Sequence, residues 1–263
     1  MKHKVLVETS VIVSASVHST RQDLAKLKHP LFDRSMNLFG SLRKHYSRKI
    51  GLITQTIEKE ASRVLEKAII EELEEDVDLT MRSTLLDLCW DRMEDLLQTL
   101  VKESLDQKRV DEKFVAVVCM YKDLMDRASL ATPFTIRAAV ESTIKYVASR
   151  RFRRLASRIR QAQSIRDLSQ LTRLRNPSQR PDIMDQFILA EAAYLSEKYN
   201  TQEPTAMFLA STDKVFSPIL RRDGSILSDY ITSEILKRLA VYCDWPDRIT
   251  RQLEEICDKT TRI

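Results

Sequence analysis

Four short apolar runs, separated by stretches with a helical pattern, constrain the fold of this chain most strongly. The runs cover residues 5–7, 50–53, 206–210 and 240–243. Short apolar strands that alternate with helices are typical of a parallel sheet with helices on both faces. The chain also has only three glycines in 263 residues, too few for the tight turns of an all-β fold. We therefore expect an α/β fold with a small parallel sheet between layers of helices.

The stretch between the second and third runs is almost wholly helical in pattern. Residues 57–174 are dominated by good helix formers and contain a single proline, Pro133. We expect four or five helices there, with breaks near residues 76–78, 106–111 and 132–133. This is more than one crossover helix needs. We therefore predict an α/β domain over residues 1–64 and 181–263, interrupted by an all-α insertion over residues 65–180.

Scarce residue types exclude several functions. The three glycines are Gly40, Gly51 and Gly224, so no glycine-rich phosphate loop can form, and P-loop NTPases and Rossmann dinucleotide binders are excluded. All four histidines lie within the first 45 residues, and none of the four cysteines forms a CxxC pair. A zinc site is therefore not expected, and the cysteines fit reduced thiols of a cytoplasmic protein.

The hydropathy pattern predicts no membrane contact. No apolar stretch approaches the roughly 18 residues that a membrane span requires. Residues 1–17 have the basic opening and apolar run of a signal peptide, but Glu8 interrupts that run. We therefore expect a buried strand that ends in a carboxylate.

Acidic residues follow the expected strands or begin the neighbouring helices. Glu8 ends the first strand, Glu60 lies about one turn into the helix after the second, Asp185 begins the helix before the third, and Asp213 lies just past the third. Ligands of open parallel sheets bind beyond the carboxyl ends of the strands. Each acid alone has an ordinary explanation in a helix dipole, a solvated helix face or a turn.

The four acids together indicate a cation site. Carboxylates gathered in one crevice repel one another unless cations balance them. No histidine or cysteine accompanies them, so an all-oxygen site would suit Mg²⁺ or Mn²⁺. A metal in such a site can activate a water and neutralise charge on phosphate oxygens, which is the chemistry of phosphodiester hydrolysis.

Five segments, in this order, carry a more specific pattern. They are VLVETSVIV at 5–13, TQTIEKE at 54–60, DQFILAEA at 185–192, STDKVF at 211–216 and VYCDWP at 241–246. Together they resemble the motifs of the PIN-domain family of metal-dependent ribonucleases, over about residues 3–64 and 181–257. The resemblance implies a small parallel sheet, an acidic pocket for one or two divalent cations, and endonucleolytic cleavage of RNA.

The resemblance also assigns roles to residues. Glu8, Glu60, Asp185 and Asp213 would be the catalytic acids that bind the metal or hold its ligands, and Thr9, Ser10 and Ser211 would support these carboxylates or a phosphate. Two departures stand out. The first acid of the family is an aspartate, whereas Glu8 carries an extra methylene that can displace a metal ligand. Residues 65–180 have no counterpart in the minimal domain.

Positive charge is concentrated in one segment. Residues 142–181 hold eleven Lys and Arg against one Asp, or +10, so the remainder of the chain carries +5 minus +10, or −5. Arg150, Arg154 and Arg158 form one helical stripe, and Arg151 adjoins it. Arginine forks onto phosphates and stacks on bases, so we expect this stripe to bind RNA. The alternatives are a solvated face or pairing with the acidic residues 58–78.

Three functions follow from these observations. The first is a Mg²⁺- or Mn²⁺-dependent endoribonuclease with RNA as its partner. The second is a PIN-like RNA-binding or scaffold protein with weak or no catalysis, which Glu8 and the long insertion favour. The third is a toxin of a toxin–antitoxin pair, which the length of the chain disfavours because such toxins are usually much shorter. Homodimer formation is left open.

Overall fold

The computed structural model describes residues 2–20, 26–73, 77–130, 183–213, 216 and 235–260. The chain forms two compact units. The first unit comprises Met1–Asp106, Leu195–Thr212 and Tyr242–Ile263, and the second comprises Gln107–Tyr194 and Asp213–Val241.

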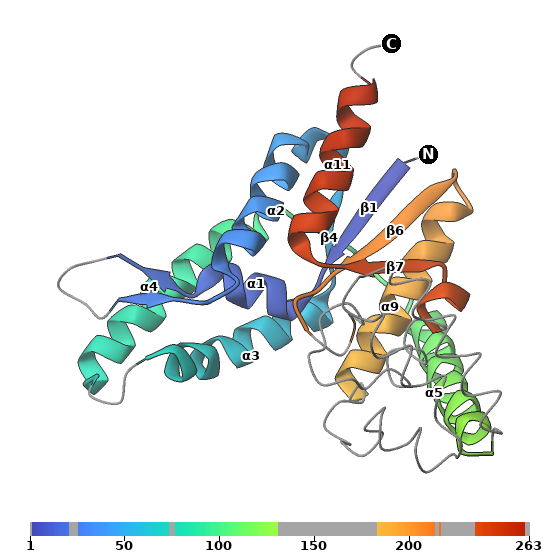
Figure 1. The fold of residues 1–263 in the computed structure, drawn as a ribbon, viewed down its shortest axis with the longest axis horizontal. Coiled ribbons are helices and arrows are strands. Elements are labelled where there is room, and N and C mark those ends of the chain that lie inside the picture. The colour runs from blue at the N-terminus through green and yellow to red at the C-terminus, as the bar shows by residue number, and fades with distance from the viewer. Residues whose placement is uncertain are drawn as a thin grey trace, which may run out of the picture. The chain divides into compact units, whose positions relative to one another are not determined.

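The chain forms a five-stranded sheet in the order β5-β4-β1-β6-β7, of which Figure 1 labels β4, β1, β6 and β7. The strands are β1 (Lys2–Val7), β4 (Gly51–Ile53), β5 (Val101–Lys102), β6 (Thr205–Ala210) and β7 (Val241–Asp244). β1 pairs in parallel with β4 and β6, and β4 pairs in parallel with β5. The mostly parallel sheet with flanking helices confirms the expected α/β class.

The chain order of the strands creates a switch point at β1. From β1 the chain continues to β4 and then β5 on one side of β1, and it later adds β6 on the other side. Val5 pairs with Gly51 of β4 and with Phe208 of β6, so β1 is central in the sheet. Ligands of open α/β sheets bind beyond the carboxyl ends of strands at such a point.

Helices precede or follow the strands of this sheet along the chain. They are α1 (Thr9–Ser16), α2 (Phe32–Lys44), α3 (Gln55–Glu72), α4 (Leu79–Leu97), α5 (Gln107–Leu130), α9 (Ile183–Asn200) and α11 (Pro246–Thr260), with a 3-10 turn η1 (Tyr46–Arg48). Within the first unit, α1 packs against α2, α3 and α4, and α11 packs against α2. None of the described helices is long and apolar enough to cross a membrane.

Side chains at helix starts explain several boundaries. The Thr54 hydroxyl accepts a hydrogen bond from the backbone N–H of Ile57 at 3.4 Å, which caps α3. Asp78 caps α4 in the same way, accepting from the N–H of Met81 at 2.7 Å. Such caps satisfy backbone donors that the first helical turn leaves without partners.

The two-residue strand β5 differs from the sequence expectation. Residues 101–102 lie within the stretch expected to be helical, but Val101 pairs with Leu52 and Lys102 with Ile53. Gly51 lets the side chain of Leu100, just before β5, pack closely against β4. A Cβ at residue 51 would lie only 2.8 Å from Cδ2 of Leu100. The antiparallel pair of β2 (His18–Ser19) and β3 (Leu27–Lys28) was also not expected.

The predicted domain boundaries differ from the compact units. The units place residues 65–106 with the central sheet, whereas the sequence analysis placed them in a helical insertion. Residues 131–182 lie outside the described part of the chain. A separate insertion over residues 65–180 therefore stays a prediction.

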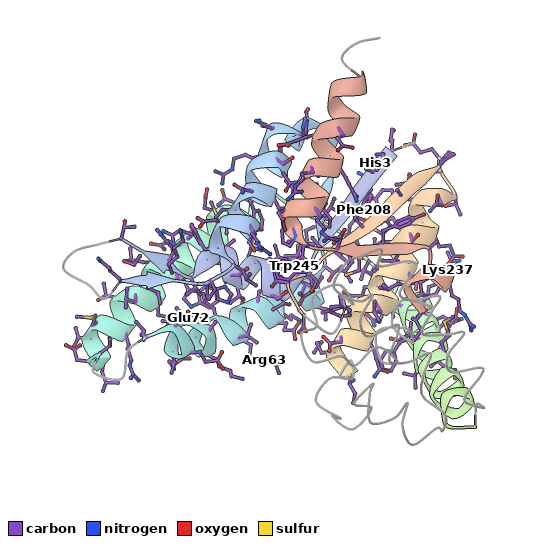
Figure 2. All side chains as sticks on the ribbon, viewed as in Figure 1. His3, Arg63, Glu72, Phe208, Lys237 and Trp245 are labelled. Carbon is purple, nitrogen blue, oxygen red and sulfur yellow. The ribbon has the colours of Figure 1, made fainter. Side chains whose placement is uncertain are left out.

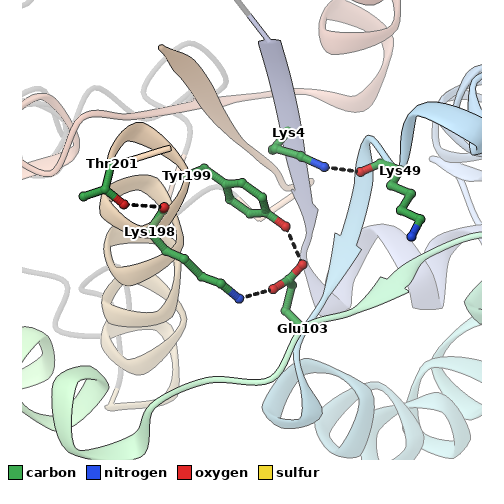
Figure 3. A network of polar contacts seen from close by, with 6 residues as sticks. All are labelled: Lys4, Lys49, Glu103, Lys198, Tyr199 and Thr201. Carbon is green, nitrogen blue, oxygen red and sulfur yellow. Dashed lines mark hydrogen bonds and ion pairs between the residues drawn. The ribbon is translucent and has the colours of Figure 1, made fainter. Parts of the chain in front are cut away.

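Glu103 ties the end of β5 to the last turn of α9 (Figure 3). Its side chain is 9% exposed, and it accepts hydrogen bonds from Nζ of Lys198 at 2.7 Å and from the hydroxyl of Tyr199. Burial raises the pKa of Tyr199, and the hydrogen bond to Glu103 adds to this effect. Nζ of Lys4 lies 4.8 Å from the centre of the Tyr199 ring and donates to the carbonyl of Lys49 at 2.6 Å.

Candidate functional site

Glu8 occupies the carboxyl end of the central strand. It follows Val7 directly, its backbone N–H donates to the carbonyl of Ala210 at 3.0 Å, and its residue exposure is only 5%. Its Oε2 accepts hydrogen bonds from the N–H and hydroxyl of Ser10 and from the hydroxyl of Ser211 at 3.0 Å. Glu8 therefore caps α1 and lies between β1 and the segment after β6.

Two serines link the start of α1 to that segment. The hydroxyl of Ser10 accepts a hydrogen bond from the N–H of Thr212 at 3.0 Å and lies 3.5 Å from the hydroxyl of Ser211. Ser211 is fully buried. With Glu8, these residues form a closed network in which three hydrogen bonds converge on one carboxylate oxygen. Hydrogen bonds of this kind favour the ionised carboxylate.

Glu60 is held by Thr9, the residue between Glu8 and Ser10 in the chain. The hydroxyl of Thr9 donates to Oε2 of Glu60 at 2.7 Å, and Thr9 is buried while Glu60 is partly exposed. Glu58, two residues earlier on α3, instead forms an ion pair with Lys102. The first unit thus holds two carboxylates near the carboxyl end of β1. The hydroxyls of Ser10 and Ser211 donate to Glu8, and the hydroxyl of Thr9 donates to Glu60.

Two further predicted acids lie in the second unit. Asp185 is in the first turn of α9 and is partly exposed. Asp213 follows Thr212 directly in the chain and is also partly exposed. Because Glu8 belongs to the first unit, a position for these aspartates beside it stays a prediction. The predicted RNA-binding residues Arg150, Arg151, Arg154 and Arg158 lie outside the described residues.

Asp244 is an acid at this end of the sheet that the sequence analysis did not select. It ends β7, and its carbonyl accepts a hydrogen bond from the N–H of Ser211 at 3.3 Å. Burial raises the pKa of its carboxyl, although the N–H of Trp245 at 2.8 Å and the nearby Arg248 lower it. An acid directly after a short apolar strand, the pattern that identified Glu8, would have identified Asp244.

The donor atoms of the network suit a hard cation. Glu8 and Glu60 supply carboxylate oxygens, and Thr9, Ser10 and Ser211 supply hydroxyls. Among the described residues, no group of three or more His, Cys, Asp or Glu side chains is placed to hold a metal ion. Mg²⁺ often needs only one or two carboxylates because it keeps several waters, so the chemistry of the donors fits Mg²⁺ or Mn²⁺.

The network lies where open parallel sheets bind ligands. It combines a buried carboxylate, a second carboxylate and three hydroxyls at the switch point of a parallel sheet. No family model, no curated protein and no solved structure matches this chain.

Proposed function

We propose that this chain is a Mg²⁺- or Mn²⁺-dependent endoribonuclease with a PIN-like fold. One observation carries the proposal. The buried carboxylate of Glu8 lies at the carboxyl end of the central strand and accepts hydrogen bonds from the hydroxyls of Ser10 and Ser211, while the hydroxyl of the next residue, Thr9, donates to Glu60. The switch point of an open parallel sheet is where such folds bind ligands.

Each residue of the network has a distinct role in this proposal. Glu8 and Glu60 hold the cation, with Thr9 orienting Glu60 and with Ser10 and Ser211 orienting Glu8. Bound there, the cation would lower the pKa of a water and neutralise charge on the phosphate. The buried position of Glu8 reduces the competition from bulk water for its charge.

The sequence pattern adds two acids and an RNA contact to the proposal. Asp185 and Asp213 complete the set of four acids, as the resemblance to the PIN-domain family implies. Arg150, Arg151, Arg154 and Arg158 lie in the +10 segment and would bind RNA phosphates. A protein with both features would bind a polyanion through its arginines. It would cleave that polyanion at a metal ion held by carboxylates.

A second function, RNA binding without turnover, is favoured by one feature of Glu8. Its Oε2 already accepts three hydrogen bonds from the chain. An oxygen with these partners can stabilise the start of α1 without any cation. The longer side chain of glutamate, compared with the aspartate of the family, also changes where its oxygens lie.

Cleavage of RNA in defined metal conditions distinguishes these functions. We expect the purified chain to cleave total RNA with Mn²⁺ or Mg²⁺ and not with chelator. Asp185→Asn and Asp213→Asn should each lower the rate by on the order of 100-fold, as loss of groups at a metal site does. Asp87→Asn, on the exposed surface of α4, is the matched control and should cleave normally.

Cleavage that persists in chelator, or in both Asn variants, would contradict the metal-site assignment. If the wild-type chain binds RNA without cleaving it, Glu8→Asp becomes decisive. Cleavage gained in that variant would show that the pocket lacks only the correct side-chain length. No gain would support the function without turnover.

A further inference from the structure

The end of α2 and the turn that leads to β4 carry a dense group of cations. Arg43, Lys44, Arg48 and Lys49 are all exposed, and they lie within seven residues. No Asp or Glu occurs in the sequence from residue 34 to residue 57. Residues 43–49 thus carry +4 in sequence, and Asp95 of α4 pairs with Arg43 at 2.8 Å.

An exposed aromatic ring lies among these cations. Tyr46 has 53% of its surface exposed and forms the first residue of η1, between Lys44 and Arg48 in sequence. A large ring that the fold leaves accessible beside several cations matches the way proteins bind single-stranded nucleic acid. There, cationic side chains follow the phosphates and aromatic rings stack on bases.

The backbone holds this turn in a defined conformation. Lys49 has φ 50° and ψ 46°, in the left-handed region, and its N–H donates to the carbonyl of Tyr46 at 2.8 Å. Nζ of Lys4, on β1, donates to the carbonyl of Lys49 at 2.6 Å (Figure 3). Glycine is the residue best suited to such a backbone, so the lysine keeps a cation at a conformational cost.

Helix electrostatics explain only part of this surface. Arg43 and Lys44 lie in the last turn of α2, where cations stabilise the negative end of the helix dipole. Arg48 and Lys49 lie beyond that turn, and Tyr46 carries no charge. A requirement for helix stability therefore does not account for these three residues.

We propose that the surface formed by Arg43, Lys44, Tyr46, Arg48 and Lys49 binds single-stranded RNA. The cations contact phosphates, and Tyr46 stacks on a base. The surface precedes β4 at its amino end, whereas Glu8 follows β1 at its carboxyl end, so in this parallel pair it is distinct from the acidic network. The choice of RNA over DNA rests on the proposed function; the contacts themselves suit either.

Fluorescence anisotropy with a labelled single-stranded RNA, in chelator and across a salt series, tests this proposal. Chelator prevents metal-dependent cleavage, so binding is measured even if the chain is no nuclease. Arg48→Ala/Lys49→Gly removes two cations, and glycine relieves the backbone at residue 49, so the folded protein should persist. Arg63→Ala/Lys67→Ala removes the same charge from the exposed surface of α3 and is the matched control (Figure 2 labels Arg63).

We expect Arg48→Ala/Lys49→Gly to weaken binding and to lower the slope of log K against log salt by about 1.4, or about 0.7 for each lost phosphate contact. The control should change neither quantity. Tyr46→Ala should weaken RNA binding about tenfold at every salt concentration, as loss of one stacked base does. Tyr46→Phe should bind like the wild type, because it keeps the ring.

Three results would overturn the proposal. One is equal weakening of RNA binding by Arg48→Ala/Lys49→Gly and by Arg63→Ala/Lys67→Ala. That result would show that only the net charge of the protein matters. The second is any result showing that Tyr46 does not stack on a base: Tyr46→Ala would then keep its RNA affinity or lose heparin binding to the same extent, because heparin has no bases. The third is that Arg48→Ala/Lys49→Gly loses binding to anionic lipid vesicles without losing binding to RNA. Tighter binding of a DNA of the same sequence would overturn the choice of RNA alone.

Discussion

At the scale of single residues, Glu8 combines two roles that are usually separate. Its side chain caps α1 by accepting the N–H of Ser10, and it is also the buried centre of a hydroxyl network. A buried carboxylate is costly unless hydrogen bonds or a cation compensate its charge. The hydrogen bonds from Ser10 and Ser211 supply part of this compensation within the chain itself.

Removing one hydroxyl of this network tests how much it stabilises the charge. Ser211→Ala deletes a donor to Oε2 of Glu8 at a fully buried position. Hydrogen bonds to charged groups contribute about 1.5–3 kcal/mol, so we expect a loss of that size in the free energy of unfolding, measured by urea denaturation. Ser62→Ala, which removes a partly buried hydroxyl bonded to the carbonyl of Glu58, should cost less than about 0.5 kcal/mol.

A loss in Ser211→Ala no larger than in the Ser62→Ala control would contradict this account. It would mean that the carboxylate of Glu8 is compensated without Ser211. The hydroxyl of Ser211 would then not be what stabilises Glu8 at the end of β1.

At the scale of elements, polar contacts of His29 close the short pair of β2 and β3 and lead the chain toward α2. The N–H of His29, just after β3, donates to the carbonyl of Val17 at 3.0 Å. Nδ1 of His29 accepts the N–H of Leu31 at 3.1 Å, so the ring must be neutral at that nitrogen. Burial lowers the pKa of His29, although Glu72 and Glu71 oppose this shift.

This histidine makes stability depend on pH in a definite direction. Its pKa in the folded protein is lower than the unfolded value of about 6.5, so the unfolded chain binds more protons near that pH. Stability should therefore fall as the pH drops below about 6.5. We expect His29→Asn, which keeps an acceptor for Leu31 but does not titrate there, to show a smaller fall in unfolding temperature between about pH 7.5 and about pH 5.

Parallel thermal melts of the two proteins at both pH values provide the measurement. An unchanged or larger fall in His29→Asn would show that His29 is not the source of the pH dependence.

The strands that the sequence predicts best are those with continuous apolar runs. Val5, Leu6 and Val7 are fully buried in β1, and their β-branched or apolar character marks them as a central strand. β5 has only two residues, one of them Lys102, so its sequence carries no strand pattern. Pairing with β4, a tertiary contact, decides its structure.

A local sequence pattern predicts one part of the candidate site and not the other. A strand followed by Glu, Thr and Ser marks Glu8, Thr9 and Ser10 in the sequence, and the structure shows the hydrogen bonds that they make. The contact between Ser211 and Glu8 spans 203 residues, and no local pattern specifies such a distance. It follows instead from the parallel pairing of β1 with β6.

At the scale of the whole molecule, the modest net charge of +5 conceals a separation of charges. Carboxylates lie at the carboxyl end of β1, while the cations of residues 43–49 lie before the amino end of β4. The +10 segment over residues 142–181 adds a further basic region in the sequence. Regions of opposite charge suit a protein that binds both cations and a polyanion.

Calorimetric titration of the metal-free chain with Mn²⁺ tests the central claim most directly, because it measures the cation site without RNA. We expect the wild type to bind Mn²⁺, and Glu8→Gln and Glu60→Gln to lose on the order of 10–100-fold in affinity. Glu66→Gln, exposed on α3, is the control and should bind like the wild type. Wild-type protein that does not bind Mn²⁺, or Glu8→Gln protein that binds it with unchanged affinity, would contradict a metal site at the end of β1.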